Sequence, residues 1–155
     1  MNKTVKITSL PKMKLAYVSH KGDFSKIGNA YGTLMQWAGA NGVLDQPNTK
    51  TITIYHDDPK EVGMGNVRQG ACITLNTMIE PGNGIGLRET TEGTFAIGHF
   101  EIDFTEFEQS WNLVFSELQI QGFQHTGEDC FEIYHNNFQE HPQKKCIVDI
   151  CVPVK

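Results

Sequence analysis

The sequence predicts an α+β protein in which two strand-helix-strand-strand modules are related by a pseudo-twofold axis. They would form an antiparallel sheet with two long helices on one face and a central groove. Three observations lead to this prediction. The chain repeats itself at an offset of 80 residues, each copy places helical apolar spacing after a short apolar strand, and each copy closes with two further β-like runs. The length suits one domain, which we expect to cover residues 1–155 with internal repeats of about 1–79 and 85–155.

The duplication is clearest when Ala16–Asn41 is set over Ala96–Gln121. After the helix the offset slips by one, and Tyr55-His56 meets Tyr134-His135. Few of the matches are identities, but residues of like type keep one order almost without gaps, which predicts two copies of one folding unit. The matched pairs are Ala16 and Ala96, Asp23 and Asp103, Phe24 and Phe104, Ser25 and Thr105, Ile27 and Phe107, Tyr31 and Trp111, Leu34 and Val114, and Gly42 and Gly122.

Each copy predicts the same succession of elements. Helices are expected over about 25–41 and 105–121, with aspartate and hydroxyl side chains available to cap their first N–H groups. They should end near Gly42 and Gly122, because glycine tolerates the left-handed cap conformation. A turn-rich linker, Glu80–Gly84, separates the copies. The expected strands are Thr4–Leu10, Leu15–Val18, Ile52–Tyr55 and Ala71–Leu75 in the first copy, and Ile85–Glu89, Phe95–Gly98, Phe131–Tyr134 and Ile147–Val152 in the second.

Composition and charge argue against several functional classes. The net charge is −5 and no basic cluster is larger than Lys144-Lys145, so direct nucleic-acid binding is not expected. No apolar run approaches the roughly 20 residues of a membrane span, and no hydrophobic stretch follows the first residues as in a signal peptide. We therefore expect a cytoplasmic protein with no membrane association. The four cysteines, none in a CxxC pair, are expected to be buried thiols.

The strand after each helix is the expected location of the binding chemistry. Side chains alternate along a strand, so Phe131 and Ile133 are expected under the helix, and Glu132 and Tyr134 on the open face. In the first copy the corresponding open-face residues are Thr53 and Tyr55. Under pseudo-twofold symmetry the tyrosines would meet around one carboxylate. Ring faces and a carboxylate suit an organic cation. A solvated glutamate on an exposed face is the alternative.

These residues resemble the GyrI-like family, the effector-binding domain of AraC-type regulators, which also occurs as free-standing proteins. The resemblance is carried by Cys130-Phe131-Glu132-Ile133-Tyr134 with Asn136-Asn137, by the ending Val152-Pro153-Val154, and by Leu34-Met35-Gln36-Trp37 with Ile54-Tyr55-His56-Asp57-Asp58-Pro59 in the first copy. It implies a groove that binds small, often cationic or lipophilic, molecules. The family's acidic residue falls on Glu132 and its aromatic residue on Tyr134, with Tyr55 opposite. Trp37 and Trp111 are expected to line the walls. The printed chain has no segment for a helix-turn-helix before Lys3 or after Lys155.

Three functions follow as alternatives. The leading one is a free-standing protein that senses or sequesters a cationic or amphiphilic ligand. The second is a hydrolase of strained electrophilic compounds, in which Glu132 would activate water; no other catalytic residue is indicated. The third is a protein-interaction role with DNA gyrase or a regulator as partner, for which the resemblance is the only basis.

No cofactor and no metal are expected. The six histidines show neither an HxxxH nor an HExxH spacing, and a site from His135, His141 and Cys146 is disfavoured. The residues after the tyrosines, His56 and His135, are expected at strand ends, where a rim position is an alternative to a purely structural one.

Overall fold

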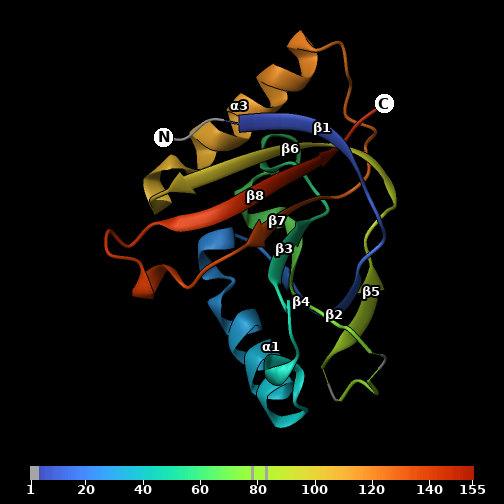
Figure 1. Ribbon diagram of the computed structural model, residues 1–155, viewed down its shortest axis with the longest axis vertical. Coiled ribbons are helices and arrows are strands. Elements are labelled where there is room, and N and C mark those ends of the chain that lie inside the picture. Colours follow the sequence, from blue (N-terminus) through green and yellow to red (C-terminus); the bar gives the residue numbers. More distant parts are fainter. Residues whose placement is uncertain (1–3, 78, 83) are drawn as a thin grey trace. The chain divides into compact units, whose positions relative to one another are not determined.

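The computed structural model describes residues 4–77, 79–82 and 84–155, so Asn83 of the predicted linker lies outside the described residues. The chain forms two compact units. The first unit is Lys12–Thr91, and the second unit combines Glu92–Lys155 with the described residues up to Pro11. Both are of the α+β class with antiparallel strands and one long helix, as predicted (Figure 1). That the whole chain acts as one domain stays a prediction.

The first unit is a four-stranded sheet with a helix packed on it. Its strands lie in the order β3-β4-β2-β5, and all neighbours are antiparallel. Helix α1 packs on β2 and β4. The elements are β2 (Lys14–Lys21), α1 (Gly28–Ala40), β3 (Thr51–Tyr55), the short α2 (Pro59–Val62), β4 (Arg68–Thr74) and β5 (Gly86–Glu89).

The second unit repeats this arrangement. Its strand order is β1-β6-β8-β7, again antiparallel, and helix α3 packs on β6 and β8. The elements are β1 (Thr4–Leu10), β6 (Gly93–Ile102), α3 (Phe107–Ile120), β7 (Cys130–Tyr134) and β8 (Cys146–Pro153). The order corresponds element by element to that of the first unit, with β1 in the place of β5.

The outermost strands are exchanged relative to their positions in the sequence. Strand β1 precedes the first unit but pairs with β6 of the second, while β5 follows β4 and pairs with β2 of the first. The two strands were expected where they occur, but their partners were not. The limits of the compact units therefore differ from the repeat boundaries taken from the sequence.

Both helices begin and end through the predicted caps. The carboxylate of Asp23 accepts a hydrogen bond of 2.9 Å from the backbone N–H of Ser25, and Asp103 forms a capping box with Glu106. One 3-10 turn follows each cap, so the α-helices start later than about 25 and 105. Gly42 and Gly122 adopt φ of 72° and 86° directly after the helices, the left-handed conformation expected of them.

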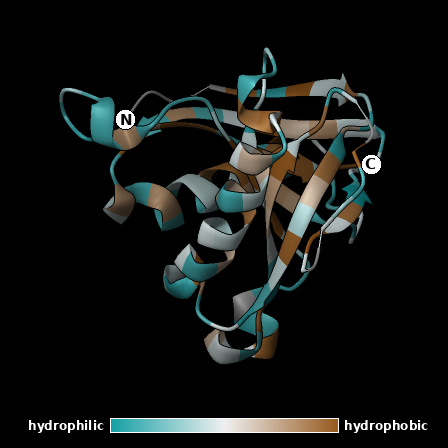
Figure 2. Ribbon diagram, turned by 90° about the horizontal axis from the view of Figure 1, so that it is seen from below, coloured by the Kyte–Doolittle hydropathy of each residue, from teal (hydrophilic) through white to brown (hydrophobic). Residues whose placement is uncertain are grey.

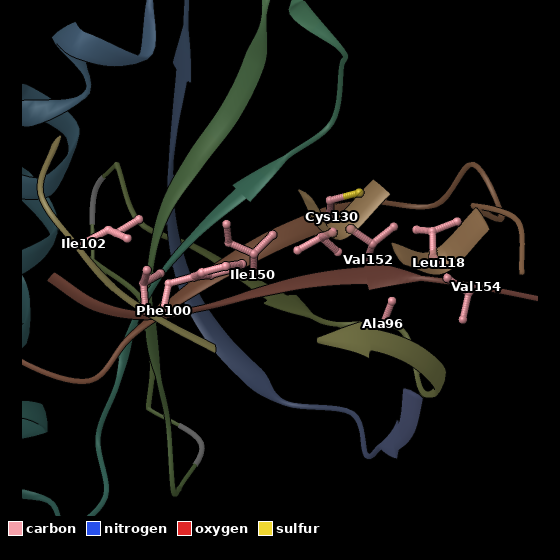
Figure 3. Packing of buried hydrophobic residues seen from close by; sticks show 10 residues of the cluster. Ala96, Phe100, Ile102, Leu118, Cys130, Ile150, Val152 and Val154 are labelled. Atoms are coloured by element: carbon pink, nitrogen blue, oxygen red, sulfur yellow. The ribbon is translucent and has the colours of Figure 1, made fainter. Parts of the chain in front are cut away.

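Each unit has its own hydrophobic core between helix and sheet. In the first unit Leu34 and Ala38 of α1 pack with Ala71 and Ile73 of β4. The equivalent cluster of the second unit joins α3 to β6, β7 and β8 (Figure 3). Its buried residues are Ala96, Phe100, Ile102, Val114, Leu118, Cys130, Val148, Ile150, Val152 and Val154.

Each long helix buries one line of side chains against its sheet. The fully buried line of α1 starts at Ala30 and that of α3 at Ser110. Tyr31 and Trp111 therefore lie beside the buried line and are only partly buried, so both rings flank the core. Figure 2 shows hydrophilic and hydrophobic colours within single helical ribbons, as this one-sided packing requires. No helix in the described part of the chain is long and apolar enough to cross a membrane.

Candidate functional site

The faces predicted for the strands after the helices are wrong. Glu132 is paired with Ile150, which belongs to the core packed under α3, and directly paired residues share a face. Thr53 is likewise paired with Ala71 of the α1 core. Glu132 and Thr53 therefore point toward their helices, not to an open face. The alternation of side chains correctly predicts which residues share a face. It does not predict which face meets the helix, because both faces of these strands are apolar enough to be covered.

Glu132 is a buried carboxylate held between two aromatic side chains. Its side chain comes from β7, and the residue is 3 % exposed. The indole N–H of Trp111 on α3 donates to Oε2 at 2.5 Å, and the hydroxyl of Tyr134 donates to Oε1 at 2.5 Å. Each carboxylate oxygen thus has a neutral donor. Burying a carboxylate costs free energy unless it is hydrogen-bonded, and these two bonds offset that cost. With a donor on each oxygen, they also hold the carboxylate in one orientation.

The rings around Glu132 are not fully enclosed. Trp111 and Tyr134 are partly exposed and pack against the second-unit core with Phe107 and Phe115. The rings of Trp111 and Phe115 stack, with centroids 6.3 Å apart, because residues four apart lie on one helix face. Glu132 therefore has an aromatic surround that keeps contact with solvent.

The first unit carries the same contact in uncharged form. The hydroxyl groups of Tyr31 on α1 and Thr53 on β3 share a hydrogen bond of 2.6 Å, and Thr53 is 2 % exposed. Tyr31 is the repeat partner of Trp111, and Thr53 that of Glu132. The helix-to-strand contact is thus conserved between the copies while its charge is not. Tyr31 was not among the predicted site residues, although its alignment with Trp111 pointed to it.

The other two predicted site residues lie elsewhere in the first unit. Tyr55 meets Phe24 edge-on, with centroids 6.3 Å apart. Trp37 is six residues beyond Tyr31, about 9 Å further along α1, and a Cβ added to Gly82 would lie 3.3 Å from its ring. The structure thus joins Glu132, Tyr134 and Trp111 by direct contacts. A ligand-binding role stays a prediction for all five residues.

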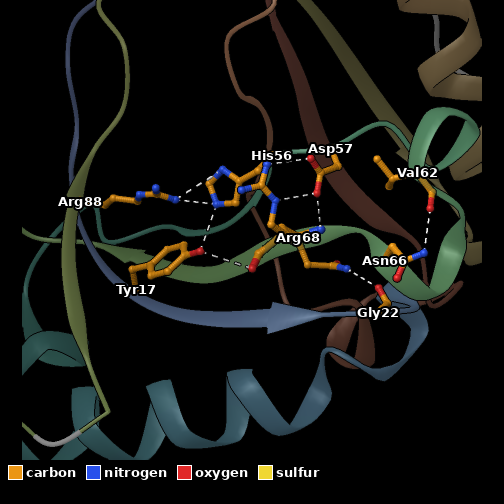
Figure 4. Close-up of polar contacts among 9 residues, drawn as sticks. Tyr17, Gly22, His56, Asp57, Val62, Asn66, Arg68 and Arg88 are labelled. Carbon is orange, nitrogen blue, oxygen red and sulfur yellow. Dashed lines mark hydrogen bonds and ion pairs between the residues drawn. The ribbon is translucent and has the colours of Figure 1, made fainter.

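A second polar cluster surrounds His56, which follows β3. The hydroxyl of Tyr17 lies 3.0 Å from Nε2 of His56, and the guanidinium of Arg88 reaches the same ring and lies 4.7 Å from the centre of the Tyr17 ring (Figure 4). Arg68 binds Asp57 through two side-chain N–H groups. The contacts of His56 tie β5 and β2 to the end of β3, and the Arg68–Asp57 pair ties β4 to the residues after β3.

The four cysteines are buried thiols, as predicted. Burial raises the pKa of Cys72 to about 12 and raises the pKa of Cys146 and of Cys151. A thiol is a poor nucleophile unless it ionises, so these three residues do not suit nucleophilic catalysis at neutral pH.

The chain is similar to proteins of one known family. The family model of the GyrI-like small molecule binding domain matches residues 3–155. A protein named DNA gyrase inhibitor, from Edwardsiella piscicida, is 27 % identical to this chain over 97 % of both sequences.

Similar structures share the fold at low sequence identity. The crystal structure of the EcmrR C-terminal domain superposes with a TM-score of 0.78 and 16 % identity, covering 100 % of this chain and 99 % of that one. A hydrolase encoded by lin2189 from Listeria innocua gives 0.66 at 12 % identity, over 97 % and 91 %. A structure of SAV2435 bound to tetraphenylphosphonium gives 0.61 at 14 % identity, over 100 % and 94 %.

Proposed function

Because this chain belongs to the GyrI-like small-molecule-binding family, we propose that it binds a lipophilic organic cation beside Glu132. The protein would sense or sequester this ligand. The observation that carries the proposal is the carboxylate of Glu132, 3 % exposed and oriented by the partly exposed rings of Trp111 and Tyr134.

The electrostatics of this arrangement favour a cation. The donors from Trp111 and Tyr134 are neutral, so their hydrogen bonds orient the carboxylate of Glu132 without neutralising its charge. A cation about 4 Å from the carboxylate gains on the order of 4 kcal/mol at an effective dielectric near 20. Each ring face adds about 0.5–2 kcal/mol, depending on how far the cation is desolvated. A neutral ligand of the same size gains only the free energy of burying its apolar surface.

The class of ligand has support from a structural neighbour. SAV2435, which shares the fold, is known with tetraphenylphosphonium bound. That ligand combines a delocalised positive charge with aromatic rings, the two properties that Glu132 and its aromatic surround would recognise. Tetraphenylphosphonium is therefore a suitable probe for this chain.

The two tryptophans allow the binding position to be tested by fluorescence. Trp37→Phe leaves Trp111 as the only tryptophan, and Trp111→Phe leaves Trp37. Titration of Trp37→Phe with tetraphenylphosphonium should give a saturable fluorescence change. A change that saturates only when Trp37 is the emitter would place the ligand away from Glu132 and contradict the proposal.

A product assay with a strained electrophile separates binding from hydrolysis. The buried carboxylate of Glu132 is also the group that a hydrolase would use as a general base, as in our second sequence-based alternative. A strained electrophile, for example an epoxide carrying an aromatic group, should bind without conversion in the proposed function. Steady product formation that Glu132→Gln abolishes would make the protein an enzyme.

A gyrase-directed role is the second candidate, because the Edwardsiella piscicida relative named DNA gyrase inhibitor matches nearly the whole chain. The test is a supercoiling assay with purified gyrase and this protein. Inhibition that rises with protein concentration and is absent for heat-unfolded protein would support the role. Unchanged supercoiling at a large molar excess would exclude it.

A further inference from the structure

Three side chains of the second unit converge on the sheet face opposite α3. His99 on β6 is paired directly with Asp149 on β8, and His135 follows β7, the neighbour of β8 on its other side. Their neighbours Phe100, Val148 and Ile150 face the core under α3, so His99 and Asp149 face away from it. The three residues come from three adjacent strands, with Asp149 in the middle.

The ligand atoms are already close. Nδ1 of His99 lies 2.6 Å from Oδ1 of Asp149, and Nε2 of His135 lies 2.9 Å from Oδ2. The potential ligand atoms all lie within 4.8 Å of one another, and the ring centroids are 5.9 Å apart. Tetrahedral Zn²⁺ with bonds near 2.1 Å requires ligand separations of about 3.4 Å, so small rotamer changes suffice.

The chemistry of the set suits a transition metal. The buried Nε2 atom of His135 has no hydrogen-bond partner among the described residues, because its approach to Asp149 lies outside hydrogen-bond geometry. Asp149 supplies a carboxylate oxygen beside the two imidazoles, and Zn²⁺ accepts this mixture of nitrogen and oxygen ligands.

We propose that His99, His135 and Asp149 form a binding site for a divalent transition-metal ion of the zinc class. Two imidazoles and one carboxylate fill three positions of such an ion and leave one for water, as in three-ligand zinc sites. His99 is half-exposed, with 51 % of its side chain accessible, which gives the ion a route from solvent. This site is separate from the one proposed around Glu132, which lies on the helix side of the sheet.

The sequence did not indicate this site, and no metal was expected. Positions 99, 135 and 149 show no ligand spacing along the chain, and only the pairing of β6 and β7 with β8 brings them together. The equivalent positions of the first unit are Ser19, His56 and Gly70. Of these three residues only His56 could bind a metal ion, so the first unit supplies an internal control for the proposed site.

The test is zinc titration of the reduced protein by calorimetry, with Co²⁺ absorption as a second readout. Wild type should bind one Zn²⁺ per chain, and His99→Ala and Asp149→Asn should each bind at least about 10-fold more weakly, because the loss of even an outer-shell partner typically costs about 10- to 100-fold in metal affinity. His56→Ala, which removes the repeat-equivalent imidazole, should bind like wild type. Circular dichroism checks that the variants are folded.

The outcomes decide the proposal. Zn²⁺ should also raise the melting temperature of wild type and His56→Ala, but not that of His99→Ala. No uptake by wild type would overturn the site. So would wild-type affinity in both His99→Ala and Asp149→Asn, or a Co²⁺ spectrum with a thiolate charge-transfer band, which would move the metal to the cysteines.

Discussion

Trp111 on α3 and Glu132 on β7 are joined by a hydrogen bond of 2.5 Å from the indole N–H to Oε2. The repeat-equivalent pair, Tyr31 and Thr53, is joined at 2.6 Å. In each unit an aromatic side chain of the helix is thus hydrogen-bonded to a buried polar side chain of the sheet. Only one copy places a carboxylate there, so the duplication supplies an uncharged reference for the charged site within the same chain.

Matched removal of two hydroxyl groups measures the difference between these contacts. Tyr134→Phe removes the donor to the Glu132 carboxylate, and Tyr31→Phe removes the partner of Thr53. Hydrogen bonds to charged groups contribute about 1.5–3 kcal/mol and neutral ones about 0.5–1.5 kcal/mol. Tyr134→Phe should therefore lower the free energy of unfolding more than Tyr31→Phe, measured by urea denaturation. Equal losses would mean that the carboxylate is not held as described.

Acid stability should depend on Asp57. Hydrogen bonds from Arg68 lower the pKa of Asp57 from 3.8 to about 2. The unfolded chain then binds this proton more tightly than the folded one, so the contribution is complete above pH 3.8 and is lost as the pH falls toward 2. The urea midpoint of wild type should fall over this range more steeply than that of Asp57→Asn. Arg68→Gln should show the same flattening, and parallel curves for all three proteins would refute the assignment.

Two glycines should respond oppositely to alanine. A Cβ at Gly98 would lie 2.5 Å from the Phe100 ring and 2.6 Å from the methyl carbon Cγ2 of Val114, so Gly98→Ala should destabilise by about 1–3 kcal/mol through overpacking. Gly32 in α1 has nothing within 4 Å of its Cβ position. Gly32→Ala should stabilise by about 0.5–1 kcal/mol through helix propensity. Thermal unfolding of both variants checks the pair, and a stabilising Gly98→Ala would show that β6 and α3 pack less closely.

Local signals in the sequence accounted for most of the elements. Asp23 and Asp103 cap the helices, and Gly42 and Gly122 end them, because capping and left-handed backbone depend on residues a few positions apart. The pairing of β1 with β6 could not be predicted from such local signals. A strand's partner depends on tertiary packing, which neither its own pattern nor its place in the repeat specifies.

The sequence named three residues that are in contact, but the face of their strand was predicted wrongly. Glu132, Tyr134 and Trp111 were named, and they are in contact. The strand was assumed to turn its apolar residues to the helix, but Phe131 is buried on the other face, beside Phe95, with centroids 5.4 Å apart. With both faces covered, hydrophobicity does not say which face meets the helix. Register with β8 decides it.

The most direct test of the account is calorimetry of wild type and Glu132→Gln with tetraphenylphosphonium and with an uncharged analogue of the same size. Glu132→Gln keeps the shape of the side chain and removes its charge. The loss of a charged contact of about 1.5–3 kcal/mol predicts roughly 10- to 150-fold weaker binding of the cation and little change for the neutral analogue. Tyr134→Ala should weaken both ligands through lost ring area. Wild-type affinity of Glu132→Gln for the cation would contradict the claim that this carboxylate recognises the ligand.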